Sequence, residues 1–227
     1  RYKNVYAFIT PSEFLKKKLS LNGFEEKKIH CIPTFTASKT TIGEQQIGSY
    51  GLYFGRVTEE KGVETVIKAY EKLPEYTVKI MGDDTTDEAK RLKKYVENHK
   101  MKNVEFLGFK SGAELENVIK GARFTLIPSI WYDNLPNTAL ESFQYSKPVI
   151  ASNIGSLPEL VIDGENGYLF KPSNVEDLIR KIKMLDDDTL VKKMGQASRK
   201  RLESRFAPQT HYEDLMKIFN EAVKSRK

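Results

Sequence analysis

Short apolar runs alternate with segments of helical periodicity along most of this chain. The apolar runs predict strands at residues 52–54, 78–81, 104–107, 124–127, 148–151 and 168–170. Between the first two runs, Val63, Val66, Ile67 and Tyr70 recur at spacings of three and four, which is typical of an amphipathic helix. Because strands and helices alternate, we predict an α/β fold with a doubly wound parallel sheet and helices on both faces.

Three capping boxes mark helix starts within this pattern, at residues 10–13, 111–114 and 173–176. The first predicts a helix with Thr10 as the N-cap, Pro11 as the first helical residue and an end at Gly23. The other two predict helices capped at Ser111 and Ser173.

The ends of the chain add elements outside the regular alternation. Residues 5–10 and 29–32 are apolar enough for two short strands, and residues 189–204 and 209–224 have helical patterns. Residues 36–48 are rich in Thr, Ser, Gly and Gln, which is typical of a linker. We therefore place a domain boundary within residues 36–48.

Ligands of doubly wound sheets bind beyond the carboxyl ends of the strands, so the loops there carry the candidate chemistry. In the first such loop, Gly55 lets a ligand approach the main chain, and Arg56 and Lys61 flank the start of a helix. Helix N-terminal amides and two cations together suit a diphosphate, although a loop with solvated charges has the same pattern. The chain has neither a Walker motif nor G-x-G-x-x-G, which disfavours an oxidoreductase.

The second loop places two carboxylates near the next strand end. Asp133 lies in the loop, and Glu141 follows eight residues later, about 1.5 turns into a helix that begins near Pro136. Carboxylates accept hydrogen bonds from vicinal hydroxyls, as sugars and riboses present them. The alternative makes Asp133 a turn former and Glu141 a surface residue.

The third loop covers residues 152–159. Gly155 and Ser156 are placed to present main-chain amides to a ligand, and Glu159 to cap a short helical turn that begins at Pro158. A plain strand-to-helix connection is the alternative.

Composition narrows the classes of protein that remain. The chain has 227 residues, of which 39% are hydrophobic and 30% charged, so it can bury a core. No apolar run approaches the roughly 18 residues of a membrane span. The single cysteine, Cys31, excludes an intrachain disulfide framework, and the three histidines are too scattered for a metal cluster or a triad. The net charge of +6 fits a nucleotide, an anionic membrane or nucleic acid without choosing among them.

The combination of these loops resembles the nucleotide-sugar-binding half of glycosyltransferase family 4, which has the GT-B fold. The resembling segments are residues 54–62, 104–108, 128–141, 148–159 and 164–172. The resemblance spans about residues 48–205 in consistent order and spacing. Residues 1–42 would then be a remnant of the N-terminal, acceptor-binding domain with its linker. Residues 43–205 would be the Rossmann-like donor-binding domain, and 206–227 a helix that packs toward the N-terminal domain.

The resemblance implies a retaining transfer from a nucleotide sugar, with no metal and no other cofactor. Arg56 and Lys61 match the pair that binds the donor diphosphate, next to Gly55. Glu141 matches the second glutamate of the E-x7-E motif, which holds the ribose hydroxyls. Asp133 stands where the first glutamate, near the donor sugar, usually stands, and this is a departure from the family pattern.

The resemblance also assigns residues without charged side chains. Asn134, Leu135 and Pro136 replace a commoner glycine-rich run whose main-chain amides meet sugar or phosphate. The main chain around Phe106 to Phe109, including Leu107, matches the strand edge that receives the base. The donor expected is UDP- or GDP-linked in preference to ADP-linked.

These matches imply the donor half of a hexosyltransferase that makes cell-surface polysaccharide or glycoconjugate on a glycan or lipid-linked acceptor. Because the chain begins at Arg1, we expect a piece of a longer protein. The single cysteine suits a cytoplasmic location. Since most of the acceptor domain would be absent, we expect this piece to be inactive in transfer by itself. Lys16, Lys17 and Lys18 on an amphipathic helix suit contact with the inner membrane face, or simply a solvated surface. Nucleic acid is not an expected partner. The alternative function is a non-catalytic nucleotide-sugar-binding module or degenerate transferase.

Overall fold

The computed structural model describes residues 2, 4–36 and 46–225 of the chain. Within these residues, six parallel strands form one sheet with the spatial order β5-β4-β3-β6-β7-β8. The strands are β3 (Tyr50–Phe54), β4 (Thr77–Met81), β5 (Val104–Gly108), β6 (Ala122–Ile127), β7 (Val149–Ser152) and β8 (Gly167–Phe170). The first strand of the sheet in sequence order, β3, lies in the middle beside β6, and the following strands extend outward on both sides. This is the order of a Rossmann-like sheet, so the predicted fold class is confirmed.

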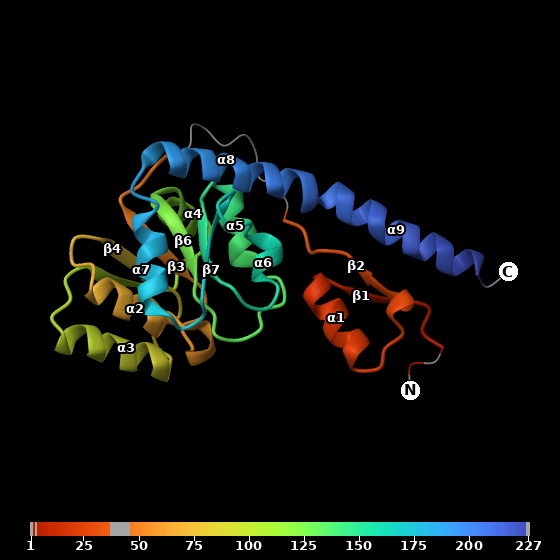
Figure 1. Ribbon diagram of the computed structural model, residues 1–227, viewed down its shortest axis with the longest axis horizontal. Helices are drawn as coiled ribbons and strands as arrows, with labels where there is room; N and C mark the ends of the chain where they lie inside the picture. Colours follow the sequence, from red (N-terminus) through yellow and green to blue (C-terminus); the bar gives the residue numbers. More distant parts are fainter. Residues whose placement is uncertain (1, 3, 37–45, 226–227) are drawn as a thin grey trace.

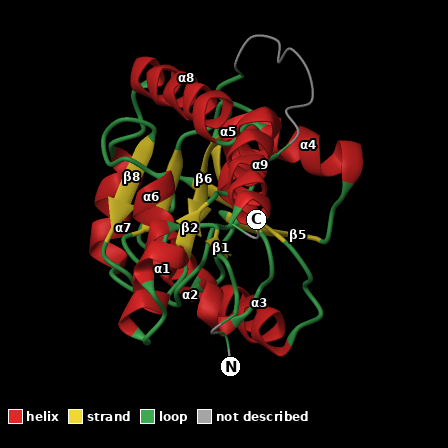
Figure 2. Ribbon diagram, turned by 90° about the vertical axis from the view of Figure 1, so that its right-hand side faces the viewer, coloured by secondary structure: helices red, strands yellow, loops and turns green. Residues whose placement is uncertain are grey.

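Helices cover both faces of this sheet (Figures 1 and 2). The helices and 3-10 turns of the main unit are η2 (Glu59–Lys61), α2 (Val63–Glu71), α3 (Asp87–Asn98), α4 (Gly112–Lys120), α5 (Asn137–Gln144), α6 (Leu157–Leu160), α7 (Val175–Lys183) and α8 (Asp188–Arg205). Alternation along the strands decides the faces, because successive side chains point in opposite directions. Leu126 and Ile150 pack with α2, α3 and α7, whereas Ile127 and Ala151 pack with α5 and α6.

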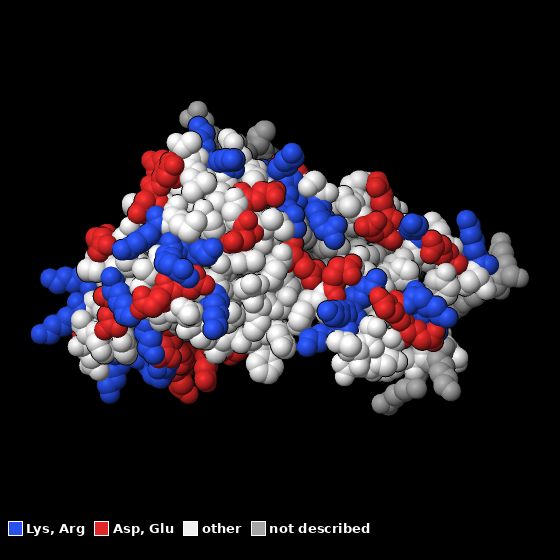
Figure 3. Space-filling model, viewed as in Figure 1, with Lys and Arg blue, Asp and Glu red and all other residues white. Residues whose placement is uncertain are grey.

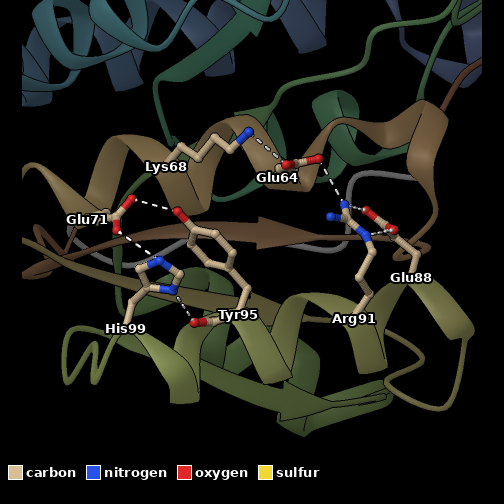
Figure 4. Close-up of polar contacts among 7 residues, drawn as sticks. All are labelled: Glu64, Lys68, Glu71, Glu88, Arg91, Tyr95 and His99. Atoms are coloured by element: carbon tan, nitrogen blue, oxygen red, sulfur yellow. Dashed lines mark hydrogen bonds and ion pairs between the residues drawn. The ribbon is translucent and has the colours of Figure 1, made fainter.

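A polar network holds α3 against α2 on one of these faces (Figure 4). Arg91 of α3 donates to Glu64 of α2 at 2.8 Å and to Glu88 of its own helix. The Tyr95 hydroxyl donates to Glu71 of α2 at 2.8 Å, and His99 stacks on the Tyr95 ring. His99 therefore has a structural role between α3 and α2.

The first part of the chain forms a separate small unit. Strands β1 (Phe8–Thr10) and β2 (Ile29–Cys31) pair in parallel, with α1 (Glu13–Leu21) and η1 (Glu26–Lys28) between them. Figure 1 shows α9 (Pro208–Lys224) running from the end of α8 along this unit. His211 of α9 lies 2.8 Å from the carbonyl oxygen of Pro33. The boundary predicted between residues 42 and 43 lies outside the described residues.

The predicted capping residues are corrected at two helices, and at a third the residue is right but its side chain does not cap. The N-cap of α1 is Ser12, whose Oγ accepts the Leu15 amide at 3.2 Å, while Thr10 ends the preceding strand. Asn174 rather than Ser173 caps α7, through the Asp177 amide. Ser111 occupies the N-cap position of α4, but its side chain makes no capping hydrogen bond. The capping-box pattern located the helix starts to within a few residues. Which side chain faces the free amides depended on the strand end or turn that precedes each helix.

Candidate functional site

The loops that follow β3 and β6 meet at the centre of the sheet, where the strand order reverses. The Ile130 amide donates to the carbonyl oxygen of Glu60 at 3.0 Å and joins the two loops. Gly62 has a φ of 67°, and a Cβ there would lie 2.1 Å from the carbonyl oxygen of Pro128. Only glycine fits this close approach, so the loops can pack together at the switch point of the sheet.

A first cavity of about 410 Å³ opens between these loops. Lys61 and Asp133 form an ion pair in its wall, with 20% and 15% of their side chains exposed. The Ser129 hydroxyl donates to the other carboxylate oxygen of Asp133. Asp133 is therefore held between a cation and a hydroxyl, and Lys61 meets a carboxylate of its own chain.

Arg56 is presented differently at the mouth of the same cavity. Its side chain is 74% exposed, with Glu60 at 3.9 Å as its partner. The main chain beneath it is fixed, because the Tyr53 hydroxyl donates to the Arg56 carbonyl oxygen. Gly55, with a φ of 144°, turns the chain out of β3 just before Arg56. Arg56 thus offers an extended guanidinium on a fixed loop.

A second cavity of about 320 Å³ adjoins the first and shares Gly55, Arg56 and Thr138 with it. Glu141 lines this second cavity, across from the ends of β4 and β5. Burial raises the pKa of the Glu141 carboxyl above its ordinary value. The two carboxylates singled out from the sequence therefore serve different cavities, with Arg56 between them.

The N-terminus of α5 points its first residues at the first cavity. Asn137 and Thr138 line it, together with Asn134, Leu135 and Pro136 of the preceding loop. The first turn of a helix carries free amides and the positive end of the macrodipole. This end of the cavity is suited to an anion.

Phe106 and Leu107 lie in β5, one of the two edge strands of the sheet. Their side chains pack against the core and line neither cavity. Phe109 and Lys110, which directly follow β5, do line the second cavity, and the Phe109 ring is 73% exposed.

Sequence reasoning gave no ligand-binding role to several lining residues: Ser129, Asn137, Thr138, Asp83 and Lys110. The available signal was positional. Asp83 follows β4 and Lys110 follows β5, so the strand-end rule applied to every strand would have found both.

In the third loop, Ser156 and Glu159 contact other segments of the protein instead of taking the ligand-binding and capping roles predicted for them. The Ser156 amide and hydroxyl both donate to the carbonyl oxygen of Asp133, at 3.2 and 2.8 Å, so this amide is not offered to a ligand. Glu159 does not cap α6 either. Its carboxylate accepts hydrogen bonds from two amides of α1.

Among the described residues, no group of three or more His, Cys, Asp or Glu side chains is arranged to hold a metal ion. No helix in that part of the chain combines the length and apolarity needed to cross a membrane. On the face shown in Figure 3, cationic and anionic side chains are interspersed.

Comparison with known proteins identifies the family. The model of the family described as "Glycosyl transferases group 1" matches residues 41–201. An uncharacterised glycosyltransferase of Methanocaldococcus jannaschii is 30% identical over 215 residues, which cover 94% of this chain and 59% of that protein. A glycogen synthase of Mycobacterium tuberculosis is 31% identical over 186 residues, which cover 78% of this chain and 42% of that protein. The chain thus spans about half the length of these relatives.

Solved structures share the fold. A glycosyltransferase of Rickettsia africae superposes with a TM-score of 0.88 at 21% identity, over 98% of this chain and 66% of that one. The Anabaena protein Alr3699/HepE, solved in complex with UDP and glucose, has a TM-score of 0.84 at 20% identity, over 95% of this chain and 63% of that one. The similarity expected with GT-B glycosyltransferases is thereby confirmed at the level of the fold.

Proposed function

Because the chain belongs to group 1 of the glycosyl transferases, we propose that it forms the donor-binding part of a retaining glycosyltransferase of family 4. The observation that carries this proposal is the pair of adjoining cavities at the switch point of the sheet. One has cations and a helix N-terminus, the other a half-buried carboxylate and apolar walls. A nucleoside diphosphate sugar has matching parts in the same order: sugar and diphosphate, then ribose and base.

Each part of the donor has a chemical partner here. Arg56 and the N-terminus of α5 bind the diphosphate, and Lys61 adds a second cation at its sugar end. Charge grows on the diphosphate as the glycosidic bond breaks, so donors fixed around it stabilise the transition state.

The nucleoside is held in the second cavity. Glu141 accepts hydrogen bonds from the ribose hydroxyls, and the exposed Phe109 ring offers a face to the base. UDP- and GDP-linked sugars are the proposed donors, in preference to ADP-linked ones.

The acceptor is proposed to be a glycan or lipid-linked molecule of cell-surface polysaccharide or glycoconjugate synthesis, bound by a further domain. In support, a relative 24% identical over 177 residues is a capsular polysaccharide biosynthesis glycosyltransferase of Staphylococcus aureus. The proposal places the protein in the cytoplasm, with the three lysines of α1 at the inner membrane face.

One observation favours the alternative, a nucleotide-sugar-binding module without transferase activity. Asp133, which replaces the family's glutamate, is engaged by Lys61 and Ser129, away from free contact with a sugar. A protein that contains this chain and an acceptor domain, assayed with donor and candidate acceptors, separates the two: the module binds donor without turnover.

The test of the proposed function is a binding panel on the 227-residue chain. UDP, GDP and ADP and their glucose conjugates are titrated by calorimetry. We expect UDP or GDP to bind, and the matching nucleotide sugar with it, and ADP and ADP-glucose to bind more weakly. Absence of binding by all six nucleotides would overturn the proposal.

A further inference from the structure

The N-terminus of α1 is capped by a residue of another part of the molecule. The two oxygens of the Glu159 carboxylate accept the amides of Glu13 and Phe14, at 2.8 and 2.6 Å. These are the first two amides of the helix, which have no partner within it. Figures 1 and 2 show α6, which carries Glu159, next to α1. Capping of α1 is thus completed only when the small unit is docked on the main one.

Ser12 links the same helix end to the candidate donor site. Its Oγ accepts the Leu15 amide at 3.2 Å and donates to Asn134 Oδ1 at 2.9 Å. Asn134 lines the first cavity. Beside this contact, the Phe14 ring packs on Tyr132 with centroids 5.0 Å apart, and Lys18 lies over Tyr132. The loop that precedes α5 is therefore held from the α1 side.

The loop is held from the α6 side as well. Ser156, directly before α6, donates two hydrogen bonds to the Asp133 carbonyl oxygen, and it is fully buried. Asp133 in turn holds Lys61. One short turn thus carries Glu159 to α1 and Ser156 to Asp133, so a continuous set of hydrogen bonds connects the helix end with the cation of the first cavity.

We propose that Glu159 is a positioning residue: it docks the N-terminus of α1 on α6, and the docked assembly holds Asp133 and Asn134 in the geometry that receives the donor sugar. This inference rests on the function proposed for this site, and it identifies the contacts that position the residues around the donor sugar. Arg56 and Glu141 lie outside these contacts. Docking should therefore affect the binding of the donor sugar more than the binding of the nucleoside diphosphate.

The first test needs no ligand. Amide hydrogen exchange is compared between the wild-type chain, Glu159→Ala and a control, Glu165→Ala, which removes an exposed carboxylate six residues further on. In Glu159→Ala we expect exchange to quicken by roughly fivefold, the size of a lost helix cap, in residues 12–21 and also in residues 129–135. The control should match the wild type.

Faster exchange in residues 12–21 alone would overturn the proposal, since Glu159 would then only cap the helix. Glu159→Gln and Glu159→Asp protect the test against loss of folding. Both keep an acceptor, the first without charge and the second with a shorter reach, so both should fall between wild type and Glu159→Ala in the two segments.

The second test uses UDP and UDP-glucose as probes. If docking favours the sugar-binding geometry, then binding of the sugar must favour docking to the same extent. UDP-glucose should slow exchange in residues 12–21 more than UDP does, and Glu159→Ala should lose more affinity for UDP-glucose than for UDP. Equal losses for both probes would overturn the positioning role. If the wild-type chain binds neither probe, GDP and GDP-glucose replace them. A chain that binds none of the four would count against the proposed function, while the ligand-free comparison still decides the coupling.

Discussion

Arg56 and Lys61 bring like charges to one cavity, yet their surroundings give them different roles. Lys61 is mostly buried against Asp133, whereas Arg56 extends into solvent with one carboxylate 3.9 Å away. An exposed pair of this kind contributes little, so Arg56 loses little when it turns to a ligand. To bind a diphosphate, Lys61 must give up its ion pair with Asp133. Arg56 is therefore the residue whose loss should cost most in diphosphate affinity.

Arg56→Ala should weaken binding of UDP or GDP by about 1.5–3 kcal/mol, the range for hydrogen bonds to charged groups. Calorimetric titration of the variant and the wild-type chain measures this difference. Arg180→Ala is the matched control, because Arg180 is equally exposed on α7, pairs with Asp177 and lines neither cavity. Equal affinities for Arg56→Ala and wild type would remove Arg56 from the diphosphate site.

Glu141→Gln should lower affinity for a ribonucleotide more than for its 2′-deoxy analogue, because a charged acceptor of the ribose hydroxyls is lost. In the wild type, the preference for the ribonucleotide over its 2′-deoxy analogue should weaken as the pH is lowered. Burial raises the pKa of Glu141, so the carboxylate takes up its proton at a higher pH than an exposed glutamate does. The ratio of the two affinities, measured across mildly acidic pH, cancels titration of the phosphates. A ratio that does not change with pH, or that changes equally in Glu141→Gln, would exclude this role.

At the scale of elements, a buried lysine joins three segments of the main unit. Lys147 precedes β7 and is 1% exposed. Its ammonium donates to the carbonyl oxygens of Gln46, Lys120 and Ala122, at 2.6, 2.6 and 2.7 Å. These carbonyls belong to the segment before β3, the end of α4 and the start of β6. The lysine thus ties together the ends of elements that lie opposite the candidate site.

Lys147→Met keeps most of the stem but leaves three carbonyl oxygens without this donor, which should cost about 3 kcal/mol or more. Urea unfolding of the variant measures the loss, with Lys72→Met, on an exposed helix end, as the control.

The pH dependence of this difference has a definite sign. Burial lowers the pKa of Lys147 to about 8, from an ordinary 10.5. Between these values the unfolded chain binds a proton that the folded chain has released, so the stability that Lys147 contributes should rise with pH across this window. The difference in free energy of unfolding between the wild type and Lys147→Met should therefore grow from about pH 8 to 10, and a difference that shrinks over this range would contradict the assignment.

At the scale of the whole molecule, the chain carries one complete α/β unit and a small unit with a two-stranded parallel sheet. The curated relatives are longer, since the chain spans 59% of one and 42% of another. Transfer in the two-domain fold that the family resemblance implies takes place between donor and acceptor domains. Orientation across such a cleft supplies much of the rate.

The 227-residue chain should therefore bind a nucleotide sugar yet transfer no sugar to an acceptor. Incubation with UDP-glucose or GDP-glucose and a glycan mixture, followed by product analysis, measures this. Only slow donor hydrolysis is expected. Rapid transfer by this chain would show that the acceptor site lies within it.

Local pattern was enough for the order of elements and for placing the candidate residues at the carboxyl ends of the strands. Apolar runs with period two and helices with period 3.6 follow from neighbouring residues, and the loops after β3 and β6 had to meet once the sheet was parallel. Gly55, Arg56, Lys61, Asp133 and Glu141 were singled out on that basis, and all line one of the two cavities.

Partner choice depended on contacts across the fold. Lys61 pairs with Asp133, 72 residues away, and Glu159 caps a helix 146 residues earlier in the chain. A carboxylate bonds to whichever donor the packing of strands and turns brings beside it, and that neighbour leaves no mark in the adjacent sequence. Side-chain chemistry could therefore be read along the chain, while the pairing that gives each charged group its role was decided by the tertiary structure.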